Sequence, residues 1–331
     1  MPLTRRQFIS RSACLLPSLA AFAVSGCSRS EPVKMGSHPW IGYEFLHLNH
    51  RLGKLPDSIH FTEYRNASEV IRGLVNQQID AATLSLDEVL IAKTKGVPLT
   101  VVMIFDISAG ADMVLAPEHI QQLSDIKGQR IGYEAGAHGQ FILAKLLEAA
   151  NLTLDDISAT PIPPHQQYDQ WKNNQIDVAI SYQPYAHPFL SDGFQVLFDS
   201  RKLPNMNYNV LAIRTEKLIT LNGAITDLIN THFKMVQLFQ KNPSDMLYEI
   251  TNTIHSRVPI NVIKQGLKGI ALPSLDRNRA MLADQETLKT IIRNLIPYIN
   301  DPSEQITYNI DDIDDLFTTK YLPMKVANDV F

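Results

Sequence analysis

The stretch Gln78-Ile79-Asp80-Ala81-Ala82 recurs later in the chain as Gln175-Ile176-Asp177-Val178-Ala179. Each copy follows an amphipathic segment and leads from a short apolar strand into a polar turn, Thr83 to Asp87 in the first case and Ser181 to Pro184 in the second. The two copies lie much too far apart for a solenoid, whose repeats are about 20–50 residues long. The recurrence therefore predicts two similar α/β lobes, each with a buried strand that ends in a turn.

The surrounding sequence supports this fold class. Short apolar runs alternate with amphipathic stretches from Val33 to Leu211, which predicts an α/β fold with mainly parallel sheet. From about Asn222 onward the apolar residues change to helical spacing, so the C-terminal third is expected to form a helical cover. The apolar residues of its first stripe are Ile225, Leu228, Ile229, Phe233, Val236 and Phe239.

The two turns are candidates for a binding site, because ligands of open α/β sheets gather where strands end and helices start. Ser85 or Asp87 could cap the helix after the first turn, and Pro184 suits the first turn of the next helix. Free backbone N–H groups at these helix starts would face the gap between the lobes. The alternative is that these residues serve only as helix caps.

Residues 1–26 are expected to be an export signal. The arginine pair in Thr4-Arg5-Arg6-Gln7-Phe8 resembles a twin-arginine signal, and the apolar run from Ala13 to Val24 is shorter than the roughly 20 residues that span a membrane. Val24-Ser25-Gly26-Cys27 resembles a bacterial lipobox, in which Cys27 would carry the lipid and residues 27–32 would be a tether. An ordinary cleaved signal with an incidental cysteine is the alternative. The export route and the membrane that holds the lipid stay open.

The composition argues against several functional classes. The formal net charge is −4, and a mildly acidic chain does not suit a nucleic-acid partner. The only two cysteines are Cys14 and Cys27, so the folded body is expected to lack disulfides, thiolate metal sites and cysteine nucleophiles. The sequence contains no Gly-x-Ser-x-Gly, His-Glu-x-x-His or phosphate-loop motif. We therefore expect no catalytic residue and no cofactor, and a monomer.

Three histidines are candidates for a metal site. His38, His47 and His50 lie close together in the sequence, and the last two are spaced to share one face of a helix. No fourth ligand is evident, so ordinary core or surface histidines are expected and no metal site is predicted.

Five stretches together resemble the family of nitrate, sulfonate, taurine and thiamine-precursor binding proteins of ABC transporters. The likeness covers roughly residues 33–213 and lies in Trp40-Ile41-Gly42-Tyr43, Gln78-Ile79-Asp80-Ala81-Ala82, Gly110-Ala111-Asp112, Asp125-Ile126-Lys127-Gly128-Gln129-Arg130-Ile131-Gly132 and Gln175-Ile176-Asp177-Val178-Ala179. The resemblance implies a type II periplasmic-binding-protein fold with the ligand in a cleft between the lobes, and a permease and ATPase encoded separately. Residues 33–110 and 205–331 would form lobe 1, and residues 111–204 lobe 2, with two crossing strands between them.

The resemblance also implies which residues face the ligand. They are Trp40, Gly42, Tyr43, Ser85, Gly110, Ala111, Asp112, Glu134, Gly136, His138, Tyr182 and Gln183. Members of the family commonly carry Trp-Glu-Pro where this chain has Tyr182-Gln183-Pro184, so a specific substrate does not transfer with the resemblance.

The chemistry of these candidates points to a small organic ligand. Trp40, Tyr43 and Tyr182 could sandwich a flat or methylated molecule. The glycines at 110, 136 and 139 would let backbone N–H groups approach a carboxylate or sulfonate. Acidic residues near them in sequence argue against a simple inorganic anion and for a zwitterion or amine. These acids are Glu44, Asp87, Glu88, Asp112 and Glu134, of which Glu44 and Glu88 also fit as solvated or capping residues. The ligand is therefore expected to be anionic or zwitterionic.

Three functions remain open at this point. The first is capture of a solute in the periplasm by a lipid-anchored protein that serves an ABC importer. The second is a ligand sensor that signals to a membrane-bound kinase or cyclase, and the sequence does not separate it from the first. The third and weakest is an enzyme on the same fold.

Overall fold

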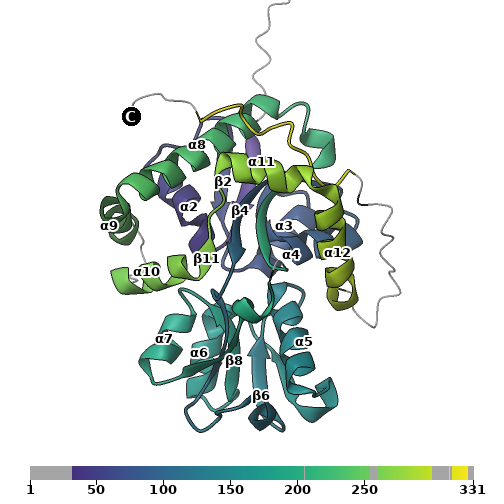
Figure 1. Cartoon of the computed structure of the whole chain (residues 1–331), viewed down its shortest axis with the longest axis vertical. Coiled ribbons are helices and arrows are strands. Elements are labelled where there is room, and N and C mark those ends of the chain that lie inside the picture. The colour runs from purple at the N-terminus through teal and green to yellow at the C-terminus, as the bar shows by residue number, and fades with distance from the viewer. Residues whose placement is uncertain (1–31, 205, 254–258, 300–312, 314, 327–331) are drawn as a thin grey trace, which may run out of the picture. The chain divides into compact units, whose positions relative to one another are not determined.

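The computed structural model describes residues 32–204, 206–253, 259–299, 313 and 315–326 (Figure 1). The expected export signal, Cys27 and nearly all of the tether lie outside these residues. Within the described part of the chain, no helix combines the length and apolar character that a membrane span requires.

The strands form two mixed sheets (Figure 1). The first runs in the order β11 (Ile270–Ala271), β4 (Leu99–Ser108), β10 (Tyr208–Arg214), β3 (Ala81–Ser85), β1 (Val33–Ser37) and β2 (Ile59–Glu63). The second runs in the order β7 (Ser158–Pro161), β6 (Arg130–Tyr133), β8 (Val178–Tyr182), β5 (Asp112–Ala116) and β9 (Gln195–Asp199). Lobe 1 is the part that carries the first sheet, and lobe 2 the part that carries the second.

The prediction of mainly parallel sheet is wrong. β1 pairs in parallel with β2 and β3, and β6 with β7 and β8, but the remaining pairings are antiparallel. The physical reason is the route of the chain. It leaves lobe 1 through β4 into β5 and returns from β9 into β10. Of these crossing strands, β10 runs against β3 and β4 in the first sheet, and β5 runs against β8 and β9 in the second.

The recurrent sequence does mark two equivalent strands, β3 and β8. In lobe 1, Met35 of β1 pairs with Ala81 and Gly36 with Ala82. In lobe 2, Ile131 of β6 pairs with Val178 and Gly132 with Ala179. The aspartate before each of these strands also makes the same backbone contact in both lobes. The Asp80 N–H donates to the Lys34 carbonyl at 2.7 Å, and the Asp177 N–H donates to the Arg130 carbonyl at 2.8 Å.

Helices cover both sheets. In lobe 1 they are α2 (Glu44–Arg51), α3 (Ala67–Val75) and α4 (Leu86–Thr94), and in lobe 2 α5 (His138–Ala150), α6 (Pro164–Lys172) and α7 (Ala186–Ser191). The C-terminal cover is helical as expected and consists of α8 (Asn222–Lys241), α9 (Pro243–Thr253), α10 (Ile260–Lys268), α11 (Leu275–Ala283) and α12 (Gln285–Ile299). Its helix α12 contacts both α4 of lobe 1 and α5 of lobe 2. In α8 the apolar stripe from Ile225 to Val236 is buried, as its spacing predicts.

The crossover between β4 and β5 requires glycine. Gly110 has φ +119°, a conformation that side chains with a Cβ rarely adopt. Gly269, which precedes β11, packs directly on this crossover. Its carbonyl accepts the Ala109 N–H at 2.7 Å, and a Cβ on Gly269 would lie 2.9 Å from the Ala111 nitrogen. The C-terminal part of lobe 1 therefore braces the link between the lobes.

Candidate functional site

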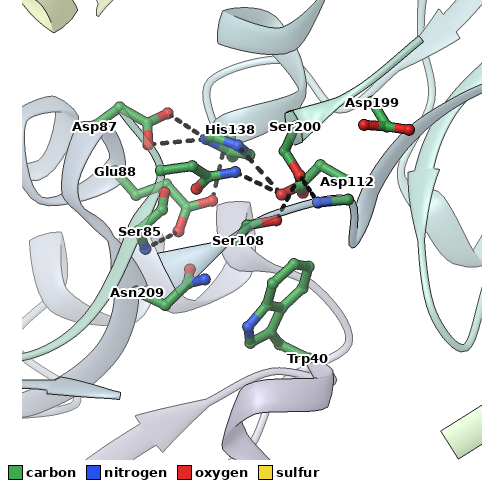
Figure 2. Close-up of polar contacts among 12 residues, drawn as sticks. Trp40, Ser85, Asp87, Glu88, Ser108, Asp112, His138, Asp199, Ser200 and Asn209 are labelled. Carbon is green, nitrogen blue, oxygen red and sulfur yellow. Dashed lines mark hydrogen bonds and ion pairs between the residues drawn. The ribbon is translucent and has the colours of Figure 1, made fainter. Parts of the chain in front are cut away.

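A buried ion pair joins the two lobes at the start of α5. The His138 Nδ1 atom of lobe 2 lies 2.9 and 3.0 Å from the two carboxylate oxygens of Asp87 in lobe 1, and Nε2 lies 3.8 Å from Asp112 (Figure 2). Burial lowers the pKa of His138, but attraction to Asp87 and Asp112 outweighs it and raises the pKa to about 10. Burial raises the pKa of Asp87, but the His138 charge holds it below its usual value. The pair is therefore an imidazolium and a carboxylate.

Two further carboxylates bind the starts of helices in the opposite lobe. Glu88 of lobe 1 accepts the His138 N–H of α5 at 3.1 Å and the Ser85 N–H of its own helix at 2.8 Å. Glu134 of lobe 2 accepts the N–H and hydroxyl of Ser68, in α3 of lobe 1, at 2.9 and 2.6 Å. Helix starts favour anions because their N–H groups are free and the helix dipole is positive there. The protein's own carboxylates thus occupy both anion-binding positions.

Burial dominates the charge state of these two glutamates. It raises the pKa of Glu88, and the neighbouring Asp87 raises it further, to about 7. Burial also raises the pKa of Glu134 above its usual value, although Ser68 opposes this by donating hydrogen bonds. Glu88 therefore has no strong bias to the ionised form at neutral pH.

Asp106 is a functional candidate that sequence reasoning missed. It lies near the end of β4, where its oxygens accept the Trp40 indole N–H at 3.0 Å and the Asn209 amide at 2.9 Å. Burial raises its pKa to about 7. A Cβ at Gly42 would lie 1.8 Å from an Asp106 oxygen, so Gly42 makes room for this carboxylate. The signal was present in the sequence as a lone acid inside an apolar strand.

Two of the three aromatic candidates touch each other. Trp40 of lobe 1 meets Tyr182 of lobe 2 edge to face, with ring centroids 5.4 Å apart. Tyr43 is fully buried and packs on His38 and Phe105 instead. Trp40 and Tyr182 therefore form an aromatic contact across the lobes, whereas Tyr43 belongs to the core of lobe 1.

The crossover residues form a second polar group. Ser200 accepts the Gly110 N–H at 2.7 Å and contacts the Ser108 hydroxyl at 2.8 Å (Figure 2). Asp112, at the start of β5, accepts the Asn207 amide at 2.5 Å, and burial raises its pKa. Ala111 is buried between these groups and Gly269. Ser108, Ser200 and Asn207 were not expected from sequence, because they come from segments that meet only in the fold.

Two of the three glycines expected to face an anion use their N–H groups within the chain. The Gly110 N–H binds Ser200, as described above. Gly136 is exposed and its N–H donates to Gln140 at 3.3 Å. A Cβ on Gly139 would lie 2.7 Å from the Glu134 nitrogen, so Gly139 allows close packing of the backbone. Binding of an anion at these glycines stays a prediction.

The helix-cap expectations have mixed outcomes. Ser85 is the N-cap of α4, as predicted. Pro184 is not in the first turn of α7, because that helix begins at Ala186 and Pro184 lies in the turn before it. Gln183 is buried beside it, and its side-chain oxygen has no hydrogen-bond partner.

The polar groups from both lobes converge on a cavity of about 20 Å³. Its lining residues are Glu88, Asp112, Glu134, His138, Gly139, Ile142, Pro164, Ile180, Ser181 and Tyr182. The Ser181 hydroxyl is buried and has no hydrogen-bond partner. Of the residues expected to face a ligand, the structure brings Asp112, Glu134, His138 and Tyr182 together at this cavity.

Larger cavities lie elsewhere but lack this convergence. Two of about 990 and 720 Å³ lie along α12 and are lined by polar and apolar residues of α5, α12 and other segments. Two charged residues of the larger one, Lys145 and Glu148, pair with each other at 2.7 Å. We therefore place the candidate site at the small cavity between the lobes, where buried charges from both lobes meet.

The histidines weighed as metal ligands have other contacts. His47 bonds to Ser37 at 2.8 Å and lies 3.4 Å from Glu63. Burial lowers the pKa of His38 to about 3, and His47 lowers it further. His50 stacks on Phe61. Within the described residues, no group of three or more His, Cys, Asp or Glu side chains could hold a metal ion.

Two lobes, each with a mixed sheet, and a double crossover between them form a periplasmic-binding-protein fold. Residues 58–217 match the family described as NMT1/THI5 like. The chain is 24% identical over 215 residues to the Escherichia coli protein named "Putative aliphatic sulfonates-binding protein", which covers 63% of this chain and 67% of the relative.

Solved structures show the same fold. The periplasmic aliphatic sulphonate binding protein SsuA of Escherichia coli superposes with a TM-score of 0.68 at 18% identity, over 88% of this chain and 99% of that one. A ligand-binding component of an ABC-type import system from Staphylococcus aureus gives 0.69 at 13% identity, over 90% and 100%. The fold also occurs in an enzyme, since the desulfurization enzyme DSZB gives 0.56 at 13% identity, over 82% and 94%.

Proposed function

We propose that this protein captures a small organic solute between its lobes and delivers it to an ABC importer whose permease and ATPase are separate chains. The observation that carries the proposal is the convergence of buried polar groups from both lobes on one cavity. A binding protein needs such groups to be shared by the lobes, because a ligand that contacts both then stabilises the closed state. The curated relative and the structural neighbours named above as binding proteins support this function.

The closed arrangement implies that the lobes separate before a ligand enters. A cavity of about 20 Å³ holds no more than about one water molecule. Opening would break the contacts of His138 with Asp87 and Glu88, of Glu134 with Ser68, and of Tyr185 with Arg65. The crossover at Gly110 is where the backbone would absorb such a movement.

The charge state of His138 favours binding over catalysis. A general base at neutral pH needs a pKa near that pH and must be able to accept a proton. Asp87 and Asp112, against the effect of burial, raise the pKa of His138 to about 10, so it stays protonated and paired. We therefore assign His138 a role in joining the lobes.

We further propose an extracytoplasmic location with a lipid at Cys27. This placement suits delivery to a membrane transporter, because a tethered receptor stays near its permease. The ligand expected from sequence is anionic or zwitterionic. Because Glu88 and Glu134 already occupy the helix starts of α5 and α3, the structure favours the zwitterionic class.

The test is a thermal-shift and calorimetry screen of the purified protein against alkanesulfonates, taurine, amino acids, amines and pyrimidines. A ligand at 100 times its dissociation constant should stabilise the protein by about 2.7 kcal/mol. We expect at least one solute to bind and to be recovered unchanged by NMR. Chemical conversion of the bound solute would instead support the enzyme alternative, and absence of binding across the panel would contradict the proposal.

A further inference from the structure

The cavity between the lobes has an excess of buried acid. Glu88, Asp112 and Glu134 line it, and each is at most 5% exposed. Within the described residues, His138 is the sole basic side chain of the lining. Both oxygens of Asp87 contact the His138 Nδ1 atom, and Asp112 lies 3.8 Å from Nε2. This one positive charge is therefore shared between a carboxylate behind the lining and one of the three lining carboxylates.

The three lining carboxylates contact neutral donors at close range. Glu88 accepts two backbone N–H groups, Glu134 accepts the N–H and hydroxyl of Ser68, and Asp112 accepts the Asn207 amide. Burial therefore raises the pKa of all three, with that of Glu88 at about 7. Hydrogen bonds alone do not compensate for the desolvation of this much negative charge.

A second, independent feature points to a donor-rich ligand. The Ser181 side chain is 2% exposed, lines the same cavity and has no hydrogen-bond partner for its oxygen. The buried hydroxyl of Tyr182, in the same lining, also lacks a partner. Buried hydroxyls without partners cost free energy, and a bound N–H group would satisfy their oxygens.

The positions that would attract an anion are filled. The Glu88 carboxylate covers the start of α5, and Glu134 covers the start of α3. An anionic group in the cavity would approach these carboxylates and Asp112 and would be repelled. A cation would be attracted to all three. The Tyr182 ring lines the same cavity, and the π face of an aromatic ring attracts an organic ammonium.

Building on the solute-binding function proposed above, we propose that this site recognises an organic ammonium group, held by the carboxylates of Glu88, Asp112 and Glu134. When the lobes open and close again on the ligand, its N–H groups bind these carboxylates and the Ser181 hydroxyl. A zwitterion would place its ammonium here and its anionic end elsewhere. His138 stays paired with Asp87, and its positive charge offsets part of the negative charge around the cavity.

The first test compares ligands that differ only in the ammonium group. Isothermal titration calorimetry would be run on the purified protein with taurine against isethionate and with ethanolamine against ethylene glycol. We expect an ammonium compound to bind at least tenfold more tightly than its partner. Equal binding of a pair, or binding of alkanesulfonates alone, would overturn the ammonium inference and leave solute binding standing. Failure of the entire wider panel would overturn both.

The second test uses the sign of proton exchange and needs no variant. A bound cation lowers the pKa of the surrounding carboxylates, so binding at pH 7 should release protons, whereas an anion would cause proton uptake. Calorimetric titrations in phosphate and Tris buffers, whose ionisation enthalpies differ, measure the number of protons released or taken up on binding. Proton release supports the proposal, and uptake or no exchange overturns it.

A matched pair of variants tests whether the carboxylates of the cavity lining bind the ammonium group. Asp112→Asn keeps the side-chain shape and should weaken binding of the ammonium compound at least tenfold. Asp155→Asn removes an exposed carboxylate outside the lining and should leave the dissociation constant unchanged. Unchanged affinity in both Asp112→Asn and Glu88→Gln would overturn the assignment. Unfolding curves without ligand show whether each variant is folded.

Discussion

The Glu88 carboxylate of one lobe accepts, at 3.1 Å, the backbone N–H of His138 at the first turn of a helix in the other lobe. Glu134 and Ser68 form the reverse contact, from lobe 2 to a helix start of lobe 1. The closed state is thus joined by two carboxylate-to-helix contacts that run in opposite directions. Because both glutamates are buried with raised pKa values, pH should control how strongly the lobes hold together.

Replacing Glu88 by Gln should change the pH dependence of stability. A carboxyl whose pKa is about 7 in the folded protein, against an ordinary value of 4.5, stabilises the fold when protonated, and this contribution is lost as pH rises from about 4.5 to 7. The loss amounts to about 3 kcal/mol at most. Glu88→Gln should therefore flatten the fall in the free energy of unfolding over this range.

Urea unfolding at pH 4.5, 5.5, 6.5 and 7.5 would measure this effect. Part of the slope should remain in the variant, because burial also raises the pKa of Asp106 to about 7. The control is Glu118→Gln, which changes an exposed glutamate and should keep the full slope. A variant profile that matches the wild type at every pH would show that Glu88 is not the group responsible.

Removing the charge of His138 should be strongly destabilising. His138→Gln would leave Asp87, which is 1% exposed, without its ionic partner, at a cost of about 3–5 kcal/mol. The double variant with Asp87→Asn should recover much of this loss, and a double-mutant cycle by urea unfolding would measure the coupling. Additive losses would contradict the ion pair. In the wild type, the stabilisation from His138 should be complete below about pH 6.5 and lost as pH rises towards 10.

The fold was largely predictable from sequence, because the evidence for it is local. The repeated strands β3 and β8 carry the same residue pattern before the same kind of turn, and the apolar stripe of α8 has helical spacing. The direction of the crossing strands was not predictable, since β4 and β10 look like any apolar strand. Strand polarity depends on the route of the chain and leaves no periodic signal.

The candidate site was predictable only in part, for a related reason. Asp112, Glu134, His138 and Tyr182 follow or precede strands, so their convergence could be expected. The contact of Glu134 with Ser68 joins two lobes and has no sequence pattern. Binding of an anion at the glycines stays a prediction, and side chains of the protein itself, such as Glu88, already contact the helix starts.

Two glycines at the crossover should tolerate no side chain. Gly110→Ala forces a Cβ into a φ of +119°, and Gly269→Ala puts a Cβ 2.9 Å from the Ala111 nitrogen, so each should cost about 1–3 kcal/mol. Gly223→Ala is the matched control. A Cβ there meets no atom within 4 Å, so this change in α8 should be neutral or stabilise by up to about 1 kcal/mol. Melting temperatures would rank the three variants, and equal values would refute the packing argument.

Tryptophan fluorescence should report movement of the lobes through one residue. The chain has two tryptophans, and Trp40 contacts Tyr182 across the lobes, while Trp171 packs on Phe189 and Phe194 inside lobe 2. A solute that binds between the lobes changes the surroundings of Trp40 and leaves those of Trp171 intact. The emission change on binding should therefore vanish in Trp40→Phe and persist in Trp171→Phe.

The same two variants also show whether loss of the emission change means loss of solute binding. Trp40→Phe also removes the N–H that Asp106 accepts at 3.0 Å, which should cost about 1–3 kcal/mol of stability. Calorimetry would show whether the solute still binds when the emission change is lost. If Trp40→Phe kept the emission change and Trp171→Phe lost it, the binding site would lie within lobe 2, because only there does Trp171 make its contacts.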